Sequence, residues 1–317
     1  MASFTILKRG NLATGQQAAF FTHIAALVFG LAGLLLVLPN AGFVAQLPEI
    51  GQKAFQLSMA GGGAVYMISG AIAVGIYAYR QTGLWHCLSF MIPALGVSLG
   101  AELLGTSTGF PFGAYHYLTG LGYKISGLVP FTIPLSWFYL GFSAYLIAYM
   151  GFKTIVSDRL SELGAIVVGA LLLTAWDFVL DPAMSQTTMP FWAWDQPGAF
   201  FGMPYQNFAG WFGTGVVFMS VATLLWRLQP KQWADNISLE LPLNIYISNF
   251  VFAMLISIDG EIYPPIFLGL LLGVLPLVWL YRLATKAERV AYGSQWPQNW
   301  ERNTGALMAS AASKGAE

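Results

Sequence analysis

The chain has 317 residues, of which 56% are apolar and only 9% are charged, whereas a soluble domain usually carries about 25% charged residues. So few charges cannot cover a water-facing surface of this size, which excludes an ordinary soluble domain and favours helices embedded in lipid. Lysine plus arginine and aspartate plus glutamate balance at 14 each, so the charge gives no indication of nucleic acid binding.

Eight apolar stretches are long enough to span a membrane, because a span needs about 20 mostly apolar residues. They are residues 18–38, 60–79, 84–104, 129–151, 162–180, 207–227, 241–259 and 263–283. We therefore predict an all-α fold, a polytopic integral membrane helical bundle of about eight transmembrane helices. It forms a single transmembrane domain over residues 1–285, followed by a polar, disordered cytoplasmic tail over residues 286–317. Pro182 predicts the end of the fifth helix.

The positive charges predict how these spans are oriented. If the N-terminus lies in the cytoplasm, the 14 lysines and arginines all fall on the cytoplasmic side except Lys53 and Lys124. Such a bias is expected of the loops that stay in the cytoplasm. We therefore expect both termini to be cytoplasmic.

Glycines recur at the spacing that lets membrane helices approach closely. Gly96 and Gly100 are four residues apart, as are Gly269 and Gly273, and residues 61–63 are all glycine. Small residues at this spacing are typical of contacts between membrane helices. We expect these glycines to allow close helix packing and to take no part in a reaction.

Acidic residues gather at the outer ends of the predicted spans. Glu102 ends the third span, and Asp177 and Asp181 end the fifth, four residues apart and therefore on one helix face. A carboxyl group embedded in a membrane is costly to ionise and is a functional hypothesis by default, with a protonated acid serving as a proton donor. The plainer alternative is that these acids bond helix ends or tryptophan N–H groups. The inner acids, among them Glu162, lie close to lysines or arginines and are expected to be ordinary solvated residues.

The outer loops combine aromatic residues with glycine and proline. Residues 109–117 read Gly-Phe-Pro-Phe-Gly-Ala-Tyr-His-Tyr, and residues 191–205 contain three phenylalanines, two tryptophans and Tyr205. An aromatic belt at the membrane interface would explain part of this composition. Aromatic walls on a tight backbone would also suit a long, rigid, apolar ligand and could stabilise a carbocation.

Several classes of cofactor chemistry lack their usual sequence signals. His23, His86 and His116 are isolated from one another, whereas a membrane di-iron enzyme needs clustered histidines. Cys87 is the single cysteine, and no glycine-rich nucleotide motif precedes a predicted helix. We therefore expect no metal and no cofactor, and the chemistry that remains is an acid–base reaction on an apolar substrate.

Three segments resemble signatures of a membrane family of carotenoid biosynthesis. They are residues 109–117, residues 175–184 (Ala-Trp-Asp-Phe-Val-Leu-Asp-Pro-Ala-Met) and residues 201–211 (Phe-Gly-Met-Pro-Tyr-Gln-Asn-Phe-Ala-Gly-Trp). The members are carotenoid 1,2-hydratases of the CruF type, related to bisanhydrobacterioruberin hydratases. The resemblance covers roughly residues 98–215.

This resemblance implies an enzyme that adds water to the terminal C1=C2 double bond of an acyclic carotenoid ψ-end. The implied partners are a carotenoid such as γ-carotene or lycopene, water, the lipid bilayer and a downstream carotenoid glycosyltransferase on a route to myxol glycosides. A cyanobacterial plasma or thylakoid membrane is the expected location. The neutral composition argues against the haloarchaeal branch of the family.

Protonation at C2 would give a tertiary cation at C1, which water then captures. Our hypothesis makes Asp177 or Glu102 the proton donor, Asp181 or Asp195 the group that orients the water, and His116 and Asn207 their hydrogen-bond partners. The candidate substrate-binding residues are aromatic, seven from the three segments and Trp194 from the outer loop between the second and third segments. They are Phe110, Phe112, Tyr115, Tyr117, Trp176, Trp194, Tyr205 and Trp211.

Two other functions remain open at this point. A carotenoid cyclase begins with the same protonation but ends with proton loss and a ring. A proton-coupled transporter would also contain embedded acids, although the sequence shows no inverted repeat and its acids gather at one face.

Overall fold

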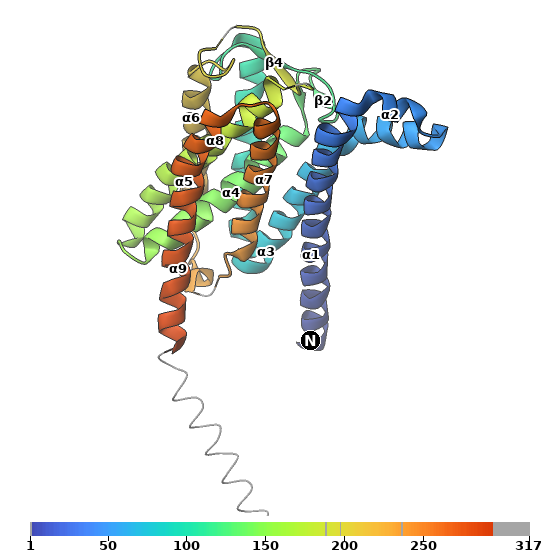
Figure 1. Cartoon of the computed structure of the whole chain (residues 1–317). Coiled ribbons are helices and arrows are strands. Elements are labelled where there is room, and N and C mark those ends of the chain that lie inside the picture. The colour runs from blue at the N-terminus through green and yellow to red at the C-terminus, as the bar shows by residue number, and fades with distance from the viewer. Residues whose placement is uncertain (1, 188, 197, 236, 294–317) are drawn as a thin grey trace, which may run out of the picture.

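The computed structural model describes residues 2–187, 189–196, 198–235 and 237–293, and these form a bundle of helices with four short strands at one end (Figure 1). The helices are α1 (Ala2–Ala32), α2 (Ala41–Gln46), α3 (Glu49–Thr108), α4 (Thr132–Lys153), α5 (Asp158–Ser185), α6 (Gln206–Trp226), α7 (Glu240–Asp259), α8 (Tyr263–Gly269) and α9 (Leu275–Gly293). A short π-helical turn, η1 (Gly33–Val37), extends α1, and a second, η4 (Leu270–Val274), joins α8 to α9. Turns of 3-10 helix occur at η2 (Leu38–Asn40) and η3 (Gln232–Asp235).

Seven helices in the described part of the chain are long and apolar enough to cross a membrane, which indicates an integral membrane protein. Seven differs from the predicted eight because the stretches 60–79 and 84–104 both lie in the sixty-residue helix α3. The backbone leaves the helical region at Gly83, with φ 84° and ψ 168°. The Cys87 Sγ lies 3.6 Å from the Gly75 carbonyl oxygen, although twelve residues of straight helix would span about 18 Å. The helix therefore folds back on itself at Gly83.

Helix α4 lies at the centre of the bundle, where 19 of its 22 residues are buried. Gly269 and Gly273 confirm the predicted close packing, since a Cβ at Gly273 would lie 2.7 Å from the Tyr246 hydroxyl. The prediction is wrong for Gly96 and Gly100, where an added Cβ would meet open space.

Two helix ends differ from the prediction. Helix α5 continues through Pro182 to Ser185, because proline removes one backbone donor but the residues after it still form the last turn. Helix α9 continues to Gly293, beyond the predicted start of the tail at residue 286. Residues 294–317, the rest of that predicted tail, lie outside the described residues.

The short strands gather at one end of the bundle, opposite the end where α1 begins and α9 finishes (Figure 1). Strand β1 (Tyr115–Tyr117) pairs antiparallel with β4 (Trp192–Trp194), and β2 (Lys124–Ile125) pairs with β3 (Val129–Pro130). The β1–β4 pair joins two loops that are far apart in sequence, so it ties the end of α3 to the end of α5.

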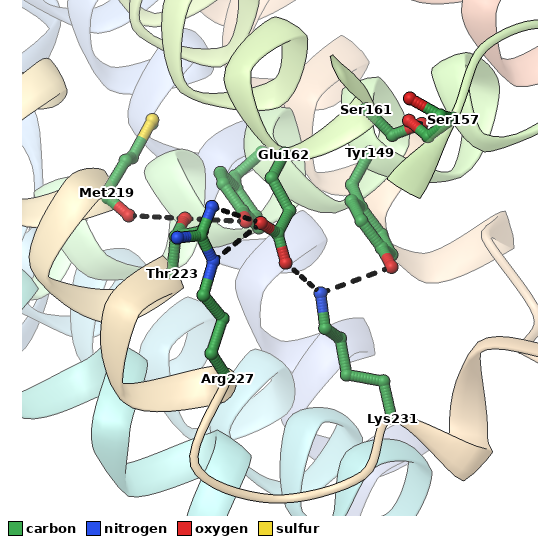
Figure 2. Close-up of polar contacts among 9 residues, drawn as sticks. Tyr149, Ser157, Ser161, Glu162, Met219, Thr223, Arg227 and Lys231 are labelled. Atoms are coloured by element: carbon green, nitrogen blue, oxygen red, sulfur yellow. Dashed lines mark hydrogen bonds and ion pairs between the residues drawn. The ribbon is translucent and has the colours of Figure 1, made fainter. Parts of the chain in front are cut away.

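A buried ion cluster lies where α5 begins and α6 ends, and it corrects the expectation that Glu162 is solvated (Figure 2). Glu162 is 5% exposed. Its Oε2 lies 2.6 Å from the Arg227 Nη2, and its Oε1 lies 2.5 Å from the Lys231 Nζ. Lys231 also donates to the Tyr149 hydroxyl at 3.3 Å. Because each charge has a partner, the carboxylate can be buried there.

Candidate active site

Glu102 lies in the last two turns of α3 and accepts hydrogen bonds on both carboxyl oxygens. The Tyr115 and Tyr117 hydroxyls both donate to Oε2, the latter at 2.8 Å, and the Trp137 Nε1 donates to Oε1 at 3.0 Å. Burial raises the pKa of Tyr115 and Tyr117 well above the usual tyrosine value, and the nearby Glu102 charge raises it further. Both hydroxyls therefore stay protonated, as donors, at neutral pH.

Asp181, in the last turns of α5, is held by donors from β4. The Trp194 Nε1 donates to Oδ1 at 2.9 Å, and the Trp192 Nε1 donates to Oδ2 at 3.3 Å. The Ser185 hydroxyl donates to Oδ1 at 3.1 Å. Asp181 is 3% exposed, so these neutral donors replace the water that a surface carboxylate would have.

The β1–β4 register explains why these donors meet the two acids. Tyr115 pairs with Trp194, and Tyr117 pairs with Trp192. Side chains alternate between the two faces of a strand, so all four aromatic rings point to the bundle and His116 points away. One small two-stranded sheet thereby supplies donors to an acid on α3 and to an acid on α5.

Asp177 is fully buried one turn before Asp181 and has the fewest hydrogen bonds of the three acids. The Asn207 Nδ2, from the first turn of α6, donates to Asp177 Oδ2 at 2.7 Å and lies 3.5 Å from Asp181 Oδ2. Asp177 Oδ1 has no hydrogen-bond partner among the described residues. Asn207 thus joins the two aspartates, and Asp177 keeps one free oxygen atom.

Glycines let the Phe112 ring lie between α3 and α6. An added Cβ at Gly105 would lie 2.7 Å from the Phe112 ring, and one at Gly210 would lie 2.5 Å from it. Both distances are too short for real contacts, so any larger residue would displace the ring. Gly210 of the third segment therefore lies against Phe112 of the first, and Gly105 makes room for the same ring on α3.

The three acids line one cavity, in which a volume of about 50 Å³ is accessible to water. This is enough for a few water molecules. Its walls are largely aromatic. Trp137 and Trp211 stack at 4.0 Å between ring centroids, and Trp176 meets Trp211 edge to face at 5.9 Å. Ring faces attract positive charge, so the cavity combines carboxyl groups with surfaces suited to a carbocation.

Most of the predicted site residues meet at this cavity. It is lined by Glu102, Phe112, Tyr115, Tyr117, Trp176, Asp177, Asp181, Trp194, Asn207 and Trp211. Phe110 and Tyr205 do not line it and are 64% and 63% exposed. His116 pairs with Asp195 at 2.7 Å on the outer surface, where both side chains are about half exposed, so neither of them reaches the acids.

Sequence reasoning missed Trp137, Trp192 and Ser185, which donate to the acids. Trp192 could have been found, because it precedes Trp194 by two residues and a strand would put both on one face. Ser185 follows Asp181 by one helical turn, which is also a readable spacing. Nothing in the sequence distinguishes Trp137 from the other aromatic residues of its span.

The comparisons with known proteins cover this region. A family model described as "Carotenoid biosynthesis protein" matches residues 62–276. Bisanhydrobacterioruberin hydratase of Haloarcula japonica is 30% identical to the chain over 230 residues, which cover 71% of this chain and 72% of the relative. No solved structure is significantly similar to the chain.

Proposed function

Because the chain belongs to the carotenoid biosynthesis protein family, we propose that it is a carotenoid hydratase. It adds water across the terminal C1=C2 double bond of an acyclic carotenoid end. The similarity to a protein named as a hydratase supports the reaction class. Lycopene and γ-carotene are the substrates we expect.

The observation that carries this proposal is the free oxygen atom of Asp177 in a small, aromatic-walled cavity. Asp177 Oδ1 is buried without a partner among the described residues, whereas Glu102 and Asp181 have their oxygens occupied by donors. An ion buried with so few hydrogen bonds is costly, so the neutral acid is the favoured resting form of Asp177. A neutral acid at that position has a proton to give.

The proposed reaction moves one proton and one water molecule. Asp177 transfers its proton to C2 of the double bond, and the π electrons form the new C2–H bond, leaving a tertiary cation at C1. The faces of Trp176 and Trp211 stabilise that charge. Water attacks C1, and its surplus proton returns to the carboxyl pair of Asp177 and Asp181, which restores the acid.

In this proposal, the site lies at the outer ends of the spans. The fold-back at Gly83 would give eight membrane crossings, with both termini in the cytoplasm. The described ends of α1 and α9 lie at the same end of the bundle, opposite the strands (Figure 1), which supports an even number of crossings and termini on the same side. A bacterial membrane, such as a cyanobacterial plasma or thylakoid membrane, remains the location we propose.

Isotope labelling tests the reaction. Membranes containing the protein are supplied with lycopene in ¹⁸O-enriched water, without air or added cofactor. We expect a 1-hydroxy product whose hydroxyl carries the label. A hydroxyl product without the label, or a product that forms only when air is admitted, would overturn the hydratase proposal, and so would an unlabelled cyclic product, which would identify a cyclase.

A further inference from the structure

A second cavity lies beside the acid cavity, between α1 and α3. It shares Tyr66, Leu121 and Met184 with the acid cavity. A third, smaller cavity shares Leu34, Met184 and Phe191 with the second. Because neighbouring cavities share these wall residues, the three lie in a row that leads from the carboxyl groups along α1, and we call the second and third together the groove.

The groove owes its depth to glycines on the two helices that form it. An added Cβ at Gly33 of η1 or at Gly62 of α3 would meet nothing within 4 Å. Gly63, by contrast, packs so closely that its Cβ would lie 2.6 Å from the Gly120 carbonyl oxygen. The two open glycines are therefore not needed for helix contact, and they leave room for something else.

The lining of the groove is apolar. Besides glycines it includes Phe29, Leu34 and Phe252. The hydroxyl of Ser58, also in the lining, already donates to the Phe55 carbonyl at 2.8 Å. Phe29 is 62% exposed on the outer surface of α1, where lipid would meet it. Because most of this lining is apolar, the groove would bind its ligand mainly through shape and apolar surface.

Helix α1 is attached to the bundle by polar contacts at one edge of the groove. His23 is buried, with Nδ1 2.7 Å from the Tyr66 carbonyl oxygen and Nε2 3.1 Å from the Asn249 Nδ2. The next turns of α1, which include Gly30 and Gly33, line the groove. A polar anchor at His23, followed by an apolar, glycine-lined stretch, leaves a slot between α1 and α3.

We propose that this groove binds the linear hydrocarbon chain of the carotenoid while its end lies in the acid cavity. This inference rests on the proposed function and adds the route and the binding surface. A substrate dissolved in the bilayer would enter sideways between α1 and α3, end first. The acid cavity then holds only the reacting end and water, which agrees with its small size.

Filling the groove tests the inference. Gly62→Leu and Gly33→Leu place a side chain in the open space, and Gly61→Leu is the matched control. Gly61 is the neighbouring residue, its Cβ would also meet nothing within 4 Å, and it does not line the groove. Binding of lycopene to purified protein is measured by the shift of its absorption band, and turnover is measured with lycopene and with a ten-carbon isoprenoid that has the same terminal double bond.

We expect Gly62→Leu and Gly33→Leu to lower the affinity for lycopene at least tenfold, and Gly61→Leu to leave it unchanged. Hydration of the ten-carbon compound should stay within twofold of wild type, because that compound does not need the groove. Unchanged lycopene affinity in both groove variants would overturn the inference. Release of co-purified lipid by these variants, with lycopene binding intact, would also overturn it by identifying a lipid groove.

The binding measurement separates the groove from the reaction. Loss of lycopene binding in the groove variants would support the groove even if the wild-type protein hydrates neither compound, which would refute the function alone. Normal lycopene hydration by the groove variants would refute the groove alone. Thermal unfolding of all three variants shows that the lost binding is not lost folding.

Discussion

A single buried carboxyl group, Glu162, and a group of three lie at opposite ends of this bundle, and their partners differ in kind. Glu162 has two cations, Arg227 and Lys231, within 2.6 Å (Figure 2). Glu102, Asp177 and Asp181 form no ion pair among the described residues and are held by tyrosine, tryptophan, serine and asparagine. A carboxylate fixed by cations has no proton to give. The difference indicates that the first group supports the fold and that the second can do chemistry.

The largest effect should follow from removing the acidic proton of Asp177, which belongs to the second group. Asp177→Asn keeps the shape of the side chain and can still accept from Asn207, so the protein should fold normally. Loss of a general acid costs about 10²–10⁴-fold in rate, and we expect hydration of lycopene to fall at least about a hundredfold. Lycopene binding should be retained. Turnover within tenfold of wild type would remove Asp177 from the mechanism.

The same change of charge in the first group should affect stability instead. Glu162→Gln leaves Lys231 and Arg227 without their anion. Breaking a buried pair costs about 3–5 kcal/mol, and the half-exposed Arg227 lowers our expectation to about 2 kcal/mol. Thermal unfolding in detergent should occur at a lower temperature, with activity per folded molecule within twofold. Loss of activity at unchanged stability would contradict the comparison.

The smallest effect should distinguish two neighbours on β1. Tyr117→Phe removes one of the donors that fix Glu102 in the wall of the acid cavity. A hydrogen bond of this kind is worth about 1.5 kcal/mol, or about tenfold. Because Glu102 lines the space that would receive the reacting end, we expect hydration to fall by about that factor. His116→Phe removes a contact with Asp195 at the exposed surface, where such contacts are worth about 0–1 kcal/mol, and should leave the rate within twofold. Equal loss in both variants would mean that strand alternation does not select the residues that matter.

The sequence predicted the helices well because each span has a simple requirement, a long apolar stretch. It predicted Glu102, Asp177 and Asp181 because acidic residues are rare in such stretches, and Asn207 because it lies in the third segment that resembles a family signature. It could not place His116, since the strand that points this side chain outward depends on pairing with residues 192–194, far along the chain. Trp137 was missed for a similar reason, because an aromatic residue in a span has many possible neighbours.

Glu162 shows the opposite error. Its proximity to charged residues in the sequence suggested a solvated surface, but Arg227 and Lys231 are more than sixty residues away in the chain and reach it only through helix packing. A residue's charge indicates that it needs a partner. Which partner it finds is a property of the tertiary structure.

The reversal of α3 at Gly83 has a consequence for how the protein is made. The two halves of this helix are joined by a single residue with a positive φ, so there is no loop between them to be handled separately during synthesis. Two apolar segments joined in this way would have to leave the translocon together, as a hairpin. The Cys87 thiol against the Gly75 carbonyl then marks a contact that can form before any later span is present.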